Sequence, residues 1–475
     1  TRDNGKTWQD VTPKGIPEWI QINAIEASPR DKGTAYVAAT MYKWDDFRPY
    51  LYKTRDYGKT WTKIVNGIPD GAFTRVVRED PVRQGLLYAG TETGLYVSFD
   101  DGVSWQPFQR NLPATPITDL AVKNDDLVVA TQGRGFWVLD DLTPLRKWSD
   151  AIAASAAYLF PPRPTVRMDI DAREEEDDEH EPAEGRNMPA GVVVDYWLKT
   201  APKDGEKVTL EFLDGDTVLR SYSNVKPPKA DDLRKEVERA EEQKDRDKPL
   251  DPKAGVNRFV WDMRVMKPTL VPKAVFNEGT KNPPKVAPGT YSARLTVDGN
   301  AYTQPIEVRA HPAGFATAAD LKAQYELLKA IRDQLSETHE TVVQIRDVRA
   351  QVEQIGDRAA RLGKGDALAK QAAGIAERLT AVEGQLTNPL IVADEDDLNY
   401  EPKLDHDWVY LAAVVASADA KPLASSVEYY RILAGRLDTA RSDYRAILDG
   451  DVKAFNQAVL KANVPPVAPA PRPAG

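Results

Sequence analysis

The sequence predicts a multidomain protein of mixed β and α structure. We expect the blades of a partial β-propeller, then an immunoglobulin-like β-sandwich, then an antiparallel helical bundle. Three observations support this fold class: a turn motif recurs three times near the N-terminus, segments of alternating apolar and polar residues follow, and apolar residues spaced by three and four begin near residue 320. The expected domains are residues 1–145, 155–311 and 315–462, followed by a proline-rich tail at 463–475.

The composition excludes several classes of protein. At 475 residues the chain is too long for a single hydrophobic core, which agrees with several domains. Its formal net charge of −10 argues against a general nucleic-acid-binding protein, which needs a basic face for phosphates. No run of 18 apolar residues occurs, so we expect no membrane-spanning helix. The absence of cysteine excludes disulfides, thiolate metal sites and cysteine nucleophiles.

The repeated motif is Ser/Thr-x-Asp-x-Gly-x-Ser/Thr-Trp, found as TRDNGKTW, TRDYGKTW and SFDDGVSW. Each aspartate can accept hydrogen bonds from backbone N–H groups across a tight turn, and each glycine supplies the positive φ that such a turn needs. Each tryptophan then covers the turn. We therefore favour a structural role over a catalytic or calcium-binding one for Asp3, Gly5, Trp8, Asp56, Gly58, Trp61, Asp100, Gly102 and Trp105.

Short strands separated by turn residues lie between the motifs and repeat in the same order. They are expected at residues 9–11, 23–27, 34–40, 49–53, 62–65, 74–79, 85–90, 94–99, 105–109, 117–122, 126–132 and 135–139. Four strands in each 44 to 53 residues are typical of a propeller blade. Because propellers need about four or more blades, we expect residues 1–145 to be the tail of a longer propeller or to be completed by another chain.

The three motifs resemble the Asp-box, or bacterial neuraminidase repeat (BNR), of sialidases, xyloglucanase-type double propellers and the sortilin/Vps10 propeller. This resemblance covers about residues 1–145, and all three copies keep Asp, Gly and Trp in register. With TQGRGFWVLDD at 131–141, the chain is similar to the C-terminal part of large bacterial sortilin-like "glycosyl hydrolase" repeat proteins. The resemblance implies a propeller scaffold and an exported bacterial protein (periplasmic, extracellular or outer-membrane-associated), but no particular activity.

The middle region alternates apolar and polar residues as half-buried antiparallel strands do. Strands are expected at 192–199, 208–213, 218–222, 257–263, 289–297 and 303–308, with turns at Asp214-Gly215 and Asp298-Gly299. Two insertions interrupt them. The acidic segment 169–184 is expected to be a solvated loop, with a Ca²⁺ site as the less favoured alternative. The segment 230–248 is expected to be an exposed helical arm.

The C-terminal region predicts a bundle of three to five antiparallel helices. Thr317 and Asp320 form a capping-box-like start to a helix that continues to about residue 355. Its buried seam is expected to contain Leu328, Ile331, Leu335, Val342, Ile345 and Val352, with Thr338 and Arg349 as polar exceptions. Further helices are expected at 366–386, 407–416 and 425–448.

The strongest candidate for a binding surface is the loop at residues 41–50. It contains Tyr42, Trp44, Asp45, Asp46, Phe47 and Tyr50. Such aromatic faces stack on sugar rings or peptide side chains; the alternative is that they pack between blades. The adjacent aspartates are a weak match to glycosidase chemistry, which needs two carboxylates about 5 to 10 Å apart.

None of the four histidines lies within five residues of another. His339 is expected at the surface or in packing, and His406 between two aspartates fits either a tuned imidazole or a helix start. The sequence shows no zinc-protease, serine-nucleophile or phosphate-loop motif.

Two functions stay open. The favoured one is a non-catalytic binding or assembly protein without a cofactor, whose partner is a protein, its own N-terminal blades, a peptide or a carbohydrate. The other is a glycoside hydrolase with its carboxylates in further N-terminal blades.

Overall fold

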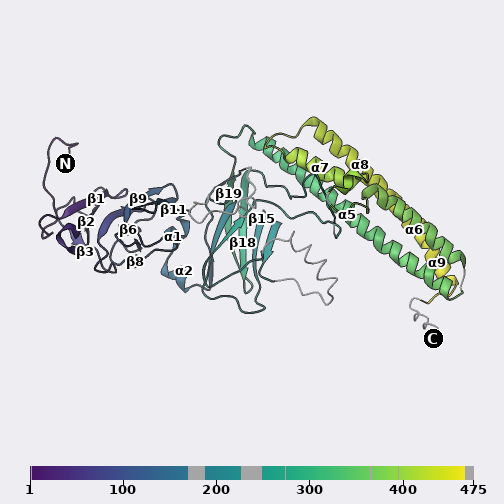
Figure 1. The fold of residues 1–475 in the computed structure, drawn as a ribbon, viewed down its shortest axis with the longest axis horizontal. Coiled ribbons are helices and arrows are strands. Elements are labelled where there is room, and N and C mark those ends of the chain that lie inside the picture. The colour runs from purple at the N-terminus through teal and green to yellow at the C-terminus, as the bar shows by residue number, and fades with distance from the viewer. Residues whose placement is uncertain are drawn as a thin grey trace. The chain divides into compact units, whose positions relative to one another are not determined.

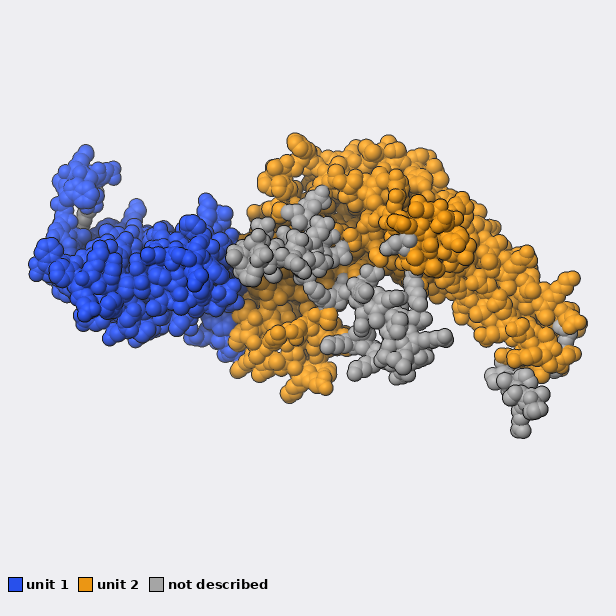
Figure 2. Space-filling view, viewed as in Figure 1, with its two compact units in different colours: residues 1–155 blue, residues 156–475 orange. Residues whose placement is uncertain are grey.

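The computed structural model describes residues 1, 3–168, 188–225, 249–272, 274–363, 366–393 and 395–465. The chain divides into two compact units, unit 1 at Thr1–Ser155 and unit 2 at Ala156–Gly475 (Figure 2). Unit 1 consists mainly of strands, whereas unit 2 combines two sheets with long helices (Figure 1). The acidic segment 169–184, with its Ca²⁺ alternative, and the arm at 230–248 lie outside the described residues.

Unit 1 contains three antiparallel sheets in which each strand pairs with the next along the chain. The first is β1 (Gln21–Ala27), β2 (Ala35–Met41), β3 (Asp46–Thr54) and β4 (Thr62–Lys63); the second is β5 (Thr74–Glu79), β6 (Leu87–Thr91), β7 (Leu95–Ser98) and β8 (Gln106–Pro107); the third is β9 (Ile117–Lys123), β10 (Asp126–Thr131) and β11 (Phe136–Leu139). Two short helices follow, α1 (Thr143–Lys147) and α2 (Asp150–Ala154).

One expected strand is wrong. Residues 9–11 form no strand, because the carbonyl of Val11 accepts a hydrogen bond from the Trp61 indole instead of joining a ladder.

The first strands of the three sheets lie side by side. Arg78 on β5 donates to the Leu120 carbonyl at 2.8 Å and to Asp119 at 2.6 Å, both on β9, and lies 3.5 Å from Glu26 on β1. The side chains between the first two sheets form a shared core that includes Leu51 and Leu87. Each sheet therefore buries a face against the next, as amphipathic sheets must.

Unit 2 begins with two sheets that face each other. One has the order β12 (Ala157–Leu159), β14 (Val192–Leu198), β17 (Gly255–Trp261); the other has the order β13 (Thr165–Val166), β19 (Asn300–Arg309), β18 (Gly289–Val297), β15 (Val208–Asp214), β16 (Thr217–Ser223). Phe212 on β15 stacks on Trp261 of β17 with ring centroids 4.4 Å apart, which joins the two sheets in one core. Their assignment to the immunoglobulin type stays a prediction.

In the described part of unit 2 the helices are α5 (Ala318–Arg361), α6 (Asp366–Leu386), the 3₁₀ helix η2 (Asp396–Leu398), α7 (Leu404–Ala416), α8 (Ala424–Ala446), the π-helical turn η3 (Ile447–Val452) and α9 (Lys453–Lys461). The capping box at Thr317 and Asp320 is confirmed. Helices α5 and α6 run antiparallel. Arg346 of α5 contacts Glu383 of α6, whereas the later residue Gly356 of α5 lies against the earlier residue Ala372 of α6. None of the described helices has the length and apolar character needed to cross a membrane.

The predicted seam of α5 is buried in the bundle core. Its members are at most 8% exposed: Leu328, Ile331, Leu335, Val342, Ile345 and Val352. The two polar exceptions have partners from other helices. Thr338 accepts a hydrogen bond from the Trp408 indole at 3.2 Å, and Arg349 donates to Glu383 at 2.5 Å.

Candidate functional site

The loop predicted to bind a ligand forms part of an exposed aromatic surface of unit 1. We use this term for Trp19, Tyr42, Trp44, Phe47 and Phe73. The short 3₁₀ helix η1 (Tyr42–Trp44) ends at Asp45, whose φ of 60° turns the chain sharply. The rings of Trp19 and Trp44 lie 6.5 Å apart and are 73% and 61% exposed. Two neighbouring indoles therefore face solvent together.

The rest of the aromatic surface is anchored on a buried ring. Tyr42 stacks on Phe73 with centroids 5.0 Å apart, and Phe47 lies 6.1 Å from the same ring. The Arg75 guanidinium carbon lies 5.3 Å from the Phe73 centroid, and Arg75 Nε donates to Glu92 at 2.7 Å. A cation over aromatic faces is a favourable arrangement. The surface thus has a fixed base and exposed indoles.

Asp46, one of the two carboxylates suggested for catalysis, is already fully engaged. Arg48 binds it through Nε at 2.9 Å and Nη2 at 2.7 Å, and the Tyr50 hydroxyl donates to it at 2.7 Å. These hydrogen bonds, chiefly those from Arg48, hold the pKa of Asp46 well below its usual range. Tyr50 is buried, and this burial together with Asp46 raises its pKa to about 12. Asp46 is therefore no proton donor at neutral pH, and its neighbour Asp45 is exposed.

Each of the three turn motifs has the same pattern of hydrogen bonds. In each copy the aspartate Oδ1 accepts the backbone N–H of the residue four positions later at 2.9 Å, and Oδ2 accepts that residue's hydroxyl; the donors are Thr7, Thr60 and Ser104. The backbone and hydroxyl donors lower the pKa of Asp3 and bring that of Asp56 to about 2. At Asp100, burial opposes this lowering of the pKa, but the Ser104 hydrogen bonds outweigh it. All three carboxylates are used within their own turns.

The motif tryptophans differ in what surrounds them. Trp105 is 5% exposed and its Nε1 donates to the Ile64 carbonyl at 2.9 Å. Trp61 donates in the same way to the Val11 carbonyl at 2.7 Å. Trp8, in the first copy, is 80% exposed. The repeated motif predicts that each ring covers its own turn, but it does not predict this link to the preceding copy.

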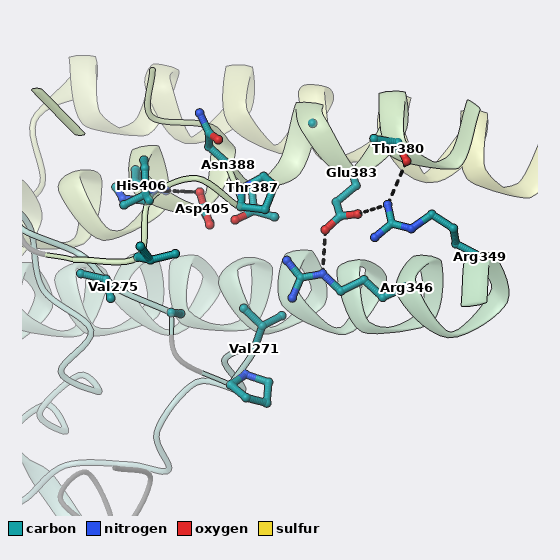
Figure 3. Close-up of a pocket in the computed structure, with 16 residues that line it drawn as sticks. Val271, Val275, Arg346, Arg349, Thr380, Glu383, Thr387, Asn388, Asp405 and His406 are labelled. Atoms are coloured by element: carbon teal, nitrogen blue, oxygen red, sulfur yellow. Dashed lines mark hydrogen bonds and ion pairs between the residues drawn. The ribbon is translucent and has the colours of Figure 1, made fainter. Parts of the chain in front are cut away.

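A second candidate site is a pocket of about 640 Å³ in the helical part of unit 2, lined by both apolar and charged residues. Figure 3 shows Glu383 of α6 reaching toward two arginines of α5. Glu383 is only 3% exposed, and its carboxylate accepts hydrogen bonds from Arg346 Nε at 2.6 Å and Arg349 Nη1 at 2.5 Å. Arg349 also donates to the Thr380 hydroxyl at 3.0 Å. This cluster joins α5 to α6, and of its members only Arg349 was expected from the sequence, as a polar exception in the seam of α5.

Two of the four histidines lie near this pocket. His406 lines it, with Nδ1 3.0 Å from a carboxylate oxygen of the buried Asp405. His339 is fully buried and its Nδ1 accepts the Val271 N–H at 3.0 Å. Burial lowers the pKa of His339 to about 4, so it is a neutral packing residue at neutral pH. In the described residues, neither Nε2 atom has a hydrogen-bond partner.

Comparisons with known proteins give only weak likenesses. No family model matches the chain, and no curated protein matches it. Among solved structures, YCF48 bound to D1 peptide is similar over 29% of this chain and 43% of its own, at 18% identity and a TM-score of 0.22. YCF48 from Cyanidioschyzon merolae is 14% identical over 30% of this chain and 45% of its own, with a TM-score of 0.21.

A third similar structure is the GH74 enzyme of Niastella koreensis, at 13% identity over 37% of this chain and 28% of that one, with a TM-score of 0.21. The chain thus spans less than half the length of each of these proteins. At these TM-scores the likenesses support no conclusion about the fold or function of this chain.

Proposed function

We propose that this chain is a non-catalytic binding and assembly protein whose aromatic surface in unit 1 contacts a protein or peptide partner. The observation that carries the proposal is the pair of exposed indoles, Trp19 and Trp44, 6.5 Å apart. Tryptophan side chains are enriched at the energetic centres of protein interfaces. Exposed aromatic clusters of this kind are costly to leave in water without a partner.

The proposal includes the scaffold. The three turns have the same pattern of hydrogen bonds, and the first strands of three successive sheets lie side by side. Both features support assigning unit 1 to Asp-box propeller blades. With this assignment we propose an exported bacterial protein of the sortilin-like kind, with an immunoglobulin-like sandwich and a helical bundle after the propeller.

Glycoside hydrolysis is the alternative, and it makes a different demand on the site. It needs two carboxylates about 5 to 10 Å apart, one of which holds a proton. Asp46 is committed to Arg48 and Tyr50, so it does not supply that group. In the described part of unit 1, no observation favours hydrolysis over binding.

Selection of peptides from a random phage-displayed library on the immobilised chain tests the proposal, followed by titration with the selected peptide. We expect Trp19→Ala and Trp44→Ala each to weaken binding by about tenfold or more, since interface tryptophans often carry a large share of the binding energy. Phe315→Ala, which removes an exposed aromatic of unit 2, is the control and should leave affinity unchanged. Unchanged binding in both tryptophan variants, or release of reducing sugar from cello-oligosaccharides, would contradict the proposal.

A further inference from the structure

The pocket in the helical part of unit 2 carries an inference that is independent of the aromatic surface. Helices α5 and α6, the start of α7 and the segments around Val275 and Ile391 line it, and all of them belong to unit 2. Its volume of about 640 Å³ lies in the range of pockets that hold small ligands. The contacts of its charged side chains indicate which groups the fold uses and which it leaves open to a ligand.

The side of the pocket formed by α5 and α6 carries an excess positive charge. Arg346 and Arg349 share the single carboxylate of Glu383, which accepts from Arg346 Nε at 2.6 Å and from Arg349 Nη1 at 2.5 Å. In the described part of the chain, the two Nη atoms of Arg346 have no hydrogen-bond partner. Figure 3 shows this guanidinium extending toward the side of the pocket that carries Asp405 and His406. Arg346 therefore presents a fork of N–H donors, the geometry that binds a carboxylate through two hydrogen bonds.

The negative charge of the pocket comes from Asp405, in the first turn of α7. Its side chain is only 3% exposed. Its Oδ1 accepts the His406 backbone N–H at 2.9 Å and lies 3.0 Å from His406 Nδ1. Its Oδ2 accepts no hydrogen bond from any residue that the structure describes. A buried carboxylate oxygen without a donor is unfavourable, so Oδ2 lacks a donor that a ligand can supply.

The two charged groups do not neutralise each other. Within the described ranges, Arg346 pairs with Glu383 and Asp405 with His406, and no ion pair joins Arg346 to Asp405. Apolar side chains form much of the remaining wall: Val271, Pro272, Ala274, Val275, Ile391 and Val392. The pocket thus combines a donor fork, a carboxylate oxygen and apolar surface.

We propose that this pocket binds a small zwitterion with an apolar body, either an amino acid or a short peptide with free termini. The carboxylate of the ligand accepts hydrogen bonds from the Nη atoms of Arg346. Its ammonium group donates to Asp405 Oδ2, and its apolar side chains contact the wall that includes Val271 and Ile391. An analogue that lacks one of the two charges leaves Arg346 or Asp405 without a partner, and polar sites reject such analogues strongly.

A series of matched ligands tests the proposal on the full chain by isothermal titration calorimetry. Leucine and the dipeptide Leu-Leu carry the same two charges on bodies of different size, so the tighter of the two shows which source of the zwitterion fits the pocket. We expect it to bind with a dissociation constant of about 1 mM or tighter. Its N-acetyl derivative lacks the ammonium group and its amide lacks the carboxylate. Each derivative should bind about tenfold more weakly or worse.

Two variants assign these charges to residues. Asp405→Asn keeps an oxygen that can accept the His406 N–H but removes the negative charge, and Arg346→Lys keeps a positive charge near Glu383 but removes the fork. Each should weaken binding of the zwitterion by about tenfold. Asp405→Asn should barely change the affinity for the N-acetyl derivative, which has no ammonium group. Arg346→Lys should likewise barely change the affinity for the amide. This coupling between variant and ligand distinguishes direct contact from a general change of the pocket.

Matched controls change the same residue types outside the pocket. Asp407→Asn lies in α7 and affects the ion pair with Arg436, and Arg378→Lys lies in α6 and affects the ion pair with Asp451. Both should leave the affinity for the zwitterion unchanged. Trp44→Ala should also leave it unchanged, which separates this site from the partner-binding role of the aromatic surface.

The proposal would be overturned if neither leucine nor Leu-Leu bound at concentrations up to about 10 mM. Equal affinity of the tighter ligand and of its two derivatives would also overturn it, as would unchanged affinity in both Asp405→Asn and Arg346→Lys. Circular dichroism checks the fold of each variant. The ligand series on the parent chain decides the outcome even where a variant does not fold.

Discussion

Replacement of His339 by asparagine tests how strongly burial of one imidazole links the stability of unit 2 to pH. The ring is fully buried in α5, and its Nδ1 accepts the Val271 N–H at 3.0 Å. Burial lowers its pKa to about 4; the Asp405 carboxylate opposes this change, while Arg346 and His406 reinforce it. Asparagine keeps an acceptor for the Val271 N–H and removes the titrating group.

The sign of the effect follows from where the proton binds. In the unfolded chain the imidazole has a pKa near 6.5, so below that pH the unfolded state binds the proton while the native state excludes it. Above pH 6.5 this ring therefore does not lower the free energy of unfolding. As the pH falls from 6.5 toward 4, that free energy decreases because only the unfolded state takes up the proton. Each pH unit over which only the unfolded state binds the proton lowers the free energy of unfolding by about 1.4 kcal/mol. A fall in pH from 6.5 to about 5 should therefore lower it by about 2 kcal/mol.

Urea unfolding of the wild type and His339→Asn at pH values of about 7 and 5 measures this difference. The wild type should lose about 2 kcal/mol more than the variant over this interval. The exposed His311, changed to Asn, is the control and should show the wild-type dependence. With four histidines in the chain, an NMR titration can follow each ring. Equal pH dependence in wild type and variant, or a His339 midpoint near 6.5, would refute the reasoning.

Two further predictions concern the packing of α5 against α6. Glu383→Gln should lower the free energy of unfolding by about 3 kcal/mol, because it leaves two arginines without their buried carboxylate; an unchanged urea midpoint would contradict this. Gly356→Ala should destabilise by about 1 to 3 kcal/mol, because the new Cβ would lie 2.6 Å from Ala372 Cβ. Gly374→Ala is the control, because a Cβ at this helical position meets nothing within 4 Å; it should raise the free energy of unfolding by about 0.5 to 1 kcal/mol. Thermal unfolding compares the two variants. A more stable Gly356→Ala than Gly374→Ala would contradict the close packing of α5 on α6.

Local patterns in the sequence predict much of the secondary structure. The expected strand 289–297 and helix 366–386 coincide with β18 and α6. Both predictions depend on the periodic alternation of apolar and polar residues, which indicates which face of a strand or helix is buried. The polar exceptions in the seam of α5 were also informative, because Thr338 and Arg349 each bind a residue of another helix.

Contacts between distant segments could not be predicted in the same way. The aromatic surface adds Trp19 and Phe73 to the loop at 41–50, and these residues come from connections before β1 and before β5. Their proximity depends on how one sheet packs on the next, which no local pattern reports. Residues 9–11 show the same limit: they have the composition of a strand, but their role is to present the Val11 carbonyl to Trp61.

The turn motif itself leaves little room for a catalytic role. Its aspartate is saturated by donors within the turn, and in the second and third copies its tryptophan is committed to the preceding repeat. A residue whose polar atoms are all hydrogen-bonded within the fold has no polar atom left to bind a ligand. Binding residues usually lie in the connections between the strands of a rigid scaffold instead. The loop between β2 and β3 occupies such a position and carries the exposed Trp44.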